Sequence, residues 1–142
     1  MKYQSNDYTC GIYAVFNLLK LMNIRATIKS IAKFTGTTPE RGTNEFGIMN
    51  ALTNFGIETG VVHCLPKDLP LDIPVPMIIC TNNLNHWVVV VCKIGKNYLI
   101  IDSNNTRQNK NENGAYVLNR KNLLKKWRNS ENVCYGISCT RF

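Results

Sequence analysis

Long hydrophobic runs are missing from this chain of 142 residues. The longest covers residues 87–92, far short of the roughly 20 apolar residues that a membrane-spanning helix needs. Residues 1–7 contain one cation and no apolar stretch, so nothing in them resembles a secretion signal. We therefore expect a cytoplasmic protein that does not contact a membrane.

A CxxC pair is also missing, although the chain has six cysteines. Such pairs are typical of structural zinc sites, so we expect no metal, and we expect no cofactor. Without an export signal, reduced thiols are favoured over disulfides. Free cysteine often serves as a small hydrophobic core residue. Four of the six fit buried strand positions: Cys64, Cys80, Cys92 and Cys134.

Acidic residues are few, with 9 Asp and Glu against 17 Lys and Arg, which gives a net charge of +8. Much of the excess falls late in the chain, where Glu112 is accompanied by Arg107, Lys110, Arg120, Lys121, Lys125, Lys126 and Arg128. No nucleic-acid motif or interleaved aromatic pattern occurs there, so a solvated basic face is favoured over nucleic-acid binding. An acidic partner for this region stays open.

Abundant Asn, Lys and Ile indicate an AT-rich genome such as that of a low-GC bacterium or a phage, and a phage protein would occupy its host's cytoplasm.

The first part of the chain has the periodicity of helices. Apolar side chains recur at intervals of three and four over residues 10–22, which predicts a helix packed on a core. Two more helices are predicted over residues 27–34 and 44–54, with Gly36 and Gly56 as their stops and Thr43 as the cap of the second. Cys10 therefore lies at the start of the first helix.

β-Branched runs replace this pattern after Gly56. Strands are predicted over residues 57–64, 75–81, 86–93, 98–102 and 133–139, with a polar loop at 106–114 and a helix over 119–127. A tight turn at Gly95 makes residues 86–93 and 97–101 a hairpin. The length, and a hydrophobic content of 44%, predict a single domain over residues 1–142. The fold class is α+β, with N-terminal helices packed on a C-terminal, mainly antiparallel sheet.

Histidine is scarce, which narrows the choice of a catalytic base to His63 and His86. Cysteine reacts as its thiolate, and both a helix N-terminus and a neighbouring imidazolium stabilise that form. Cys10 has the first of these. His63 lies within a strand with no carboxylate at a matching position, which favours a structural or surface role. His86 opens an apolar strand, from which its ring can reach a cleft.

Asp102 and Gln4 complete the candidate site. In the predicted hairpin, residue 102 returns close to the level of residues 86–89, so Asp102 can approach His86. An acceptor on the imidazole fixes its tautomer and leaves the other nitrogen free to take the thiol proton. Acyl transfer also needs donors for the oxyanion, and the Gln4 amide and the N–H of Cys10 are the candidates. Alternatively, Asp102 merely ends a strand and Gln4 is an ordinary polar residue.

The stretches QSNDYTCG at 4–11, NHWVVV at 85–90 and LIID at 99–102 resemble one known family. It comprises the papain-like cysteine peptidases that cleave double-glycine leaders from bacteriocin precursors, together with similar stand-alone domains. The Gly42-Thr43 loop and the late helix ending at Trp127 fit the same pattern. The resemblance covers essentially the whole chain and implies a papain-like fold, a triad of Cys10, His86 and Asp102, and an oxyanion role for Gln4.

The chain also departs from that family. Ile12 follows the Cys-Gly pair, where the family often has Pro or Ala, and Asp102 is followed by Ser103 rather than Pro. Neither change removes a reacting group. The bacteriocin-processing members are fused to membrane transporters, whereas no transmembrane segment occurs here, so export of a leader peptide is not supported and the substrate is open.

The leading hypothesis is a cysteine peptidase that hydrolyses a peptide or isopeptide bond of a peptide or protein substrate through a thioester. A second hypothesis keeps the same triad in an amidase, deamidase or transamidase, since water or another amine can resolve a thioester. A third is a binding or inhibitory module that uses its basic face on an acidic partner. The presence of Gln4, Cys10, His86 and Asp102 together argues against the third.

Overall fold

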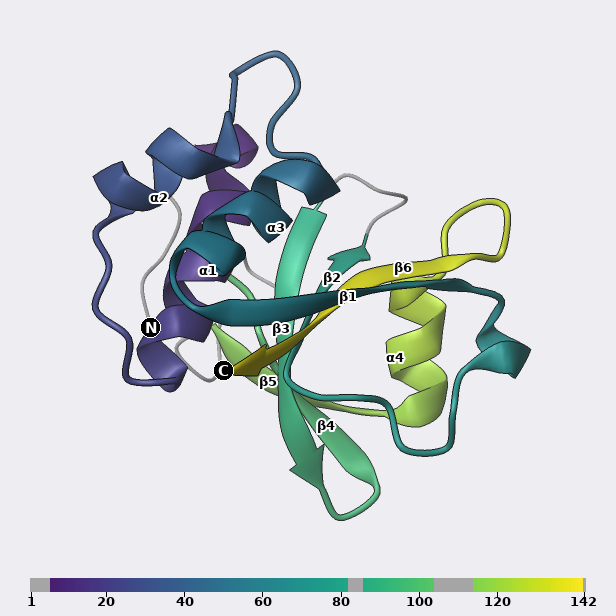
Figure 1. Cartoon of the computed structure of the whole chain (residues 1–142). Helices are drawn as coiled ribbons and strands as arrows, with labels where there is room; N and C mark the ends of the chain where they lie inside the picture. Colours follow the sequence, from purple (N-terminus) through teal and green to yellow (C-terminus); the bar gives the residue numbers. More distant parts are fainter. Residues whose placement is uncertain (1–5, 82–85, 104–113, 142) are drawn as a thin grey trace.

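Helices occupy the first part of the chain and strands most of the rest (Figure 1). The computed structural model describes residues 6–81, 86–103 and 114–141. The helical elements are η1 (Asp7–Thr9), α1 (Cys10–Leu21), α2 (Ile28–Thr35), α3 (Glu45–Asn54), η2 (Pro66–Asp68) and α4 (Arg120–Trp127). The strands are β1 (Ile57–Cys64), β2 (Met77–Thr81), β3 (His86–Ile94), β4 (Asn97–Ile101), β5 (Ala115–Asn119) and β6 (Cys134–Arg141). The predicted α+β class is confirmed.

The helices begin and end at residues suited to those positions. The Thr27 hydroxyl accepts a hydrogen bond from the Ser30 N–H at the start of α2. Gly36 follows that helix with a φ of 65°, a left-handed conformation that glycine adopts without strain. The cap of α3 is Asn44, whose Oδ1 accepts from the Gly47 N–H at 2.9 Å. Thr43 was therefore the wrong cap, because its side chain is buried and turned to other contacts.

The six strands form one sheet in the order β1-β6-β2-β3-β4-β5. Every paired neighbour is antiparallel. The last strand of the chain, β6, lies between β1 and β2, so the first and last strands pair at one edge of the sheet. As a result β2 and β3 are central, and all five residues of β2 are buried.

The sheet buries both faces, and alternate residues of its central strands belong to two separate cores. One core joins Ile78 and Val89 to the helices α1, α2 and α3. The other joins Ile79 and Val88 to Trp127 and the rest of the inner side of α4. Figure 1 shows α1–α3 on one side of the sheet and α4 on the other. This doubly covered arrangement explains the continuous apolar run of β3.

One strand was missed by the sequence prediction. β5 pairs with β4 at the edge of the sheet and leads directly into α4. It is short and half-exposed, with Val117 49% exposed, and no turn residue separates it from the helix. The predicted loop at 106–114 lies outside the described residues except for Gly114.

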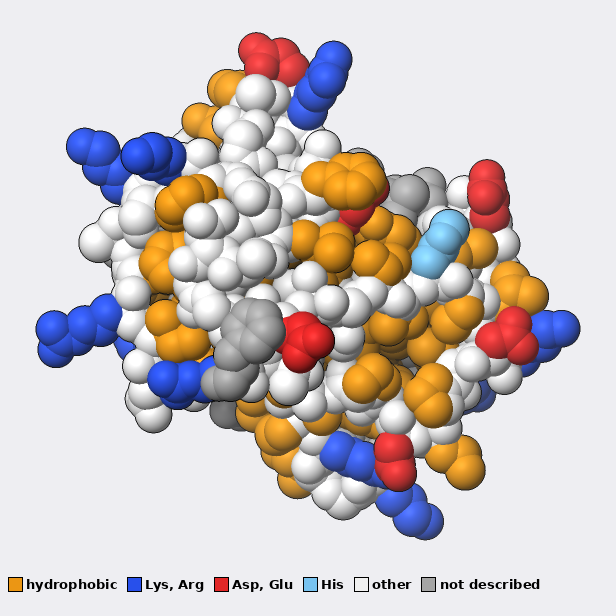
Figure 2. All heavy atoms as spheres, viewed as in Figure 1, with side chains coloured by type: hydrophobic (Ala, Val, Ile, Leu, Met, Phe, Trp, Pro, Cys, Tyr) orange, Lys and Arg blue, Asp and Glu red, His pale blue; other side chains and the backbone are white. Residues whose placement is uncertain are grey.

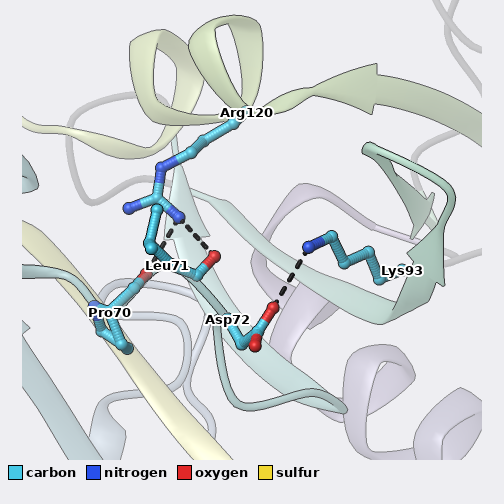
Figure 3. A network of polar contacts seen from close by, with 5 residues as sticks. All are labelled: Pro70, Leu71, Asp72, Lys93 and Arg120. Carbon is cyan, nitrogen blue, oxygen red and sulfur yellow. Dashed lines mark hydrogen bonds and ion pairs between the residues drawn. The ribbon is translucent and has the colours of Figure 1, made fainter.

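The segment before β2 is held by side chains from two distant elements (Figure 3). Arg120 of α4 donates hydrogen bonds to the carbonyls of Pro70 and Leu71 at 2.9 and 3.0 Å. Lys93 of β3 contacts Asp72 at 3.1 Å. Arg120, one of the late cations, therefore serves the fold itself.

None of the helices in the described parts of the chain is long and apolar enough to cross a membrane.

Candidate active site

Cys10 is the first residue of α1, and its side chain is buried at the junction of the helix and the sheet, with 5% exposed. The N–H groups at a helix start carry partial positive charge and lack partners within the helix. An anion at this position is therefore stabilised by the backbone. The prediction that Cys10 begins a helix is confirmed.

Thr43 connects the start of α1 to β3. A Cβ added to Gly11 would lie 2.6 Å from the Thr43 Cβ, so only glycine allows this approach. The Thr43 carbonyl accepts a hydrogen bond from Nε1 of Trp87 at 2.8 Å. Trp87 directly follows His86, so this contact links the backbones on which Cys10 and His86 stand. The family resemblance includes Gly42-Thr43, but it does not indicate that Thr43 joins α1 to β3.

His86 and Asp102 form a buried pair. His86 Nε2 lies 2.6 Å from Asp102 Oδ1, and the two residues are 7% and 4% exposed. His86 begins β3 and pairs with Thr81 of β2. The Asp102 N–H donates to the Gly114 carbonyl at 2.8 Å, which continues the β4–β5 pairing by one residue and holds Asp102 in place.

A bulge in β3 decides which face of the hairpin Asp102 occupies. Near the turn, Ile94 pairs with Asn97, and the register shifts by one between Val90 and Cys92. Val91 is therefore one extra residue in β3, and beyond it Val89 pairs with Ile101. With side chains alternating along each strand, this shift places Asp102 on the face of His86, whereas the unshifted register would place it on the other.

The electrostatics of His86 follow from this setting. Burial disfavours the charged ring, but hydrogen bonding to Asp102 and Cys10 and the negative charges of both groups outweigh it and raise the pKa of His86 from 6.5 to about 9. Nε2 faces Asp102, so Nδ1 is the nitrogen left for Cys10. The structure thus brings together three of the predicted site residues in the order Cys10, His86, Asp102.

Four other thiols have raised pKa values because burial disfavours their thiolates. The pKa is about 12 for Cys80 and Cys139 and about 11 for Cys134, and burial followed by the charge of Asp68 raises that of Cys64. These thiols stay protonated near neutral pH. Cys80, Cys134 and Cys139 are buried core residues, and Cys64 is partly buried against the second core.

The second histidine does not contact Asp102 in the way that His86 does. His63 is exposed on β1, with its ring edge-to-face against Tyr135 at a centroid distance of 5.3 Å. Gln4 and Asn85 lie outside the described residues. Among the residues that the structure does describe, no group of three His, Cys, Asp or Glu side chains is arranged to hold a metal ion.

A hollow of about 360 Å³ adjoins the site. It lies between the N-terminal end of α3 and the paired strands β1 and β6, and its lining includes Glu45, Cys80, Trp87 and Tyr135. Figure 2 shows hydrophobic side chains gathered on this part of the surface, with Lys and Arg mostly projecting from its outer edges. Sequence reasoning found neither Glu45 nor Tyr135, because no motif contains them.

A helix-borne thiol beside a sheet-borne imidazole and carboxylate, on an α+β scaffold, defines the class of papain-like cysteine peptidases. The model of the peptidase C39 family matches residues 1–131, and the chain belongs to that family. It is a cysteine peptidase. No curated protein sequence matches the chain.

Several solved structures share the fold. The double-glycine-motif protease of an AMS/PCAT transporter, solved in complex with its leader peptide, superposes with a TM-score of 0.78 at 18% identity, over 99% of this chain and 89% of that one. The peptidase domain of Streptococcus ComA gives 0.75 at 17% identity, over 99% and 97%. The C39-like domain of a Vibrio parahaemolyticus toxin secretion protein gives 0.68 at 7% identity, over 94% and 98%.

Proposed function

We propose that the chain hydrolyses a peptide bond through a thioester on Cys10, with His86 as the proton carrier and Asp102 as the residue that orients it. The observation that carries this proposal is the His86 ring, which contacts Asp102 through Nε2 and also interacts with Cys10. A ring whose Nε2 is bound by a carboxylate is held in one tautomer and one orientation, and its Nδ1 is left for proton transfer.

The peptide, one water molecule, Cys10 and His86 supply every atom and proton that the proposed reaction needs. The Cys10 thiolate attacks the carbonyl carbon, an S–C bond forms, and the carbonyl oxygen becomes an oxyanion. When the C–N bond breaks, the His86 imidazolium gives its proton to the leaving amine. A water molecule then attacks the thioester and passes a proton to His86, and the carboxylic acid leaves as the thiolate is restored.

The oxyanion needs donors at the position where its charge develops. The N–H of Cys10, at the first position of α1, is one candidate. The Gln4 amide is the second candidate, from its place in the sequence shortly before α1 and from the family resemblance. Each donor of this kind lowers the barrier by about 3 to 4 kcal/mol.

A peptide is the proposed substrate. The AMS/PCAT transporter protease was solved with a leader peptide, and this chain shares its fold over almost its entire length. The hollow beside Cys80 and Trp87 offers space for a side chain next to the reacting groups.

Digestion of a peptide library, read by mass spectrometry, tests the catalytic assignment. Cys10→Ala and His86→Ala should lower turnover by at least about 10³-fold. Cys64→Ala removes a partly buried thiol that packs against the second core, and this matched control should keep its turnover. Loss of turnover in Cys64→Ala with retention in Cys10→Ala would refute the assignment.

An amidase or transamidase would use the same triad. Adding a primary amine during turnover separates the reactions, because a transamidase forms the new amide and a hydrolase forms the acid. A binding or inhibitory module would show neither product and would keep its partner after Cys10→Ala.

An acidic partner for the basic late region is a separate proposal. Lys121, Lys125 and Arg128 line a hollow of about 270 Å³ together with Leu124 and Pro66. Within the described residues, none of these three cations forms an ion pair with a carboxylate. Binding of an acidic peptide should weaken with salt and with Lys125→Gln, and unchanged binding in that variant would exclude this surface.

A further inference from the structure

The hollow beside the active site contains a carboxylate, that of Glu45, which forms no ion pair with any cation in the described parts of the chain. Glu45, in the first turn of α3, lines it and is partly buried. Arg41 and His63 also line the hollow, yet within the described residues neither forms an ion pair with Glu45. The negative charge of Glu45 is therefore available to a bound molecule.

Two aromatic rings stand beside that carboxylate. Trp87 and Tyr135 both line the hollow, with centroids 6.4 Å apart and planes tilted by 58°. Tyr135 interacts with Glu45 directly: after burial, the charge of Glu45 and its hydrogen bonding are the main causes that raise the pKa of Tyr135 to about 12. A carboxylate beside aromatic rings is a setting that attracts an ammonium or guanidinium group.

The hollow also lies next to residues that neighbour the reacting groups. Cys80 lies in its wall and pairs with Trp87 across β2 and β3, one step from the Thr81–His86 pair. The charges of Cys10 and Glu45 both act on the Cys80 thiol. A group bound against Glu45 would therefore belong to a residue near the scissile bond.

We propose that this hollow binds a lysine or arginine side chain of the peptide substrate, with Glu45 as the ionic partner and Trp87 and Tyr135 as the walls. The inference rests on the proposed peptidase function and specifies its substrate class. The volume of about 360 Å³ is sufficient for one long side chain. The aliphatic stem of such a side chain packs on the aromatic walls while its charged end meets the carboxylate.

A positional scan tests this specificity. Peptides carry Lys, Arg, norleucine or Glu at each of several positions on both sides of the scissile bond. Norleucine is included because it has a long side chain without charge. At one position the wild type should prefer Lys or Arg over norleucine by about tenfold or more in kcat/KM. Glu45→Gln should reduce that ratio to near one, and Glu45→Lys should reverse it in favour of Glu.

Glu58→Gln is the matched control, because Glu58 is exposed at the opposite end of β1 from His63. It should keep the preference of the wild type. A preference for cations that survives in Glu45→Gln overturns the inference, as does cleavage without any cation preference.

Binding to Cys10→Ala separates this inference from the peptidase proposal. Titration of the same peptides should show a Glu45-dependent advantage of Lys over norleucine in affinity. If the wild type cleaves no peptide but this advantage appears, the peptidase proposal fails and the cation site stands. If peptides are cleaved but bind without the advantage, the cation site is refuted.

Discussion

His86 Nε2 and Asp102 Oδ1 lie 2.6 Å apart because a bulge inserts one extra residue into β3 where it pairs with β4. The extra residue, Val91, shifts the register so that both side chains lie on one face of the hairpin. The charge of Asp102 also acts on Tyr116, whose partner Ile100 lies two residues before Asp102 on the same face of β4. A bulge in the hairpin thus determines the geometry of the proposed base.

Replacing Asp102 with Asn should leave the fold intact and lower kcat by about 10² to 10⁴-fold, since the amide can hold the wrong tautomer of His86. It should also move the alkaline limb of the pH–rate profile to lower pH, because the carboxylate helps to raise the pKa of His86. Steady-state kinetics across pH measure both effects. An alkaline limb that stays in place would mean that Asp102 does not set the charge of His86.

Activity should fall as the pH rises through about 9, where His86 loses the proton that the leaving amine needs.

The free energy of unfolding should also fall as the pH rises. Because the pKa of His86 is raised by folding, its contribution is fully present below pH 6.5 and is lost as the pH rises through about 9. Urea unfolding at several pH values should show a loss on the order of 2 kcal/mol over that range.

His86→Gln provides the comparison for that experiment. The variant has no group that titrates at this position, so its free energy of unfolding should vary less between pH 6.5 and 9. An equally steep decline in the variant would assign the pH dependence to other groups.

Replacing Gly11 with Ala should destabilise the protein by about 1 to 3 kcal/mol, because the added methyl group would lie 2.6 Å from the Thr43 Cβ. It should also lower kcat, since relief of the clash separates the start of α1 from the Thr43 loop and β3. Gly60→Ala is the control: there the nearest atom is the Ser138 hydroxyl oxygen at 2.8 Å, which can rotate away. Equal losses of stability in the two variants would contradict this account.

Alkylation with iodoacetamide near neutral pH should modify Cys10 before Cys80, Cys134 and Cys139. The reason is that those three thiols have pKa values raised by burial and stay protonated, whereas Cys10 lies at a helix start beside the His86 ring. Peptide mapping after brief exposure measures the order. Modification of Cys80 ahead of Cys10 would count against Cys10 as the nucleophile.

Helices and turns were predictable where neighbouring residues in the sequence carry the signal. The helix starting at Cys10 follows from its apolar periodicity, and the tight turn after Ile94 is visible in Gly95 and Lys96. β5 was not predictable, because its residues acquire a strand conformation only by pairing with the exposed edge of β4. The cap at Asn44 was misassigned to Thr43, since the choice depends on which of the two side chains the tertiary contacts bury.

The sequence by itself determined which residues could take part in the chemistry: one thiol at a helix start, two histidines and a carboxylate at the end of a strand. It also determined the α+β class, because helical and strand periodicities occupy different parts of the chain. Only the tertiary structure decided that Val91 shifts the register, that Thr43 joins Gly11 to Trp87, and that Glu45 stands beside Tyr135. These relationships depend on contacts between residues far apart in the chain, and no local pattern of side chains encodes them.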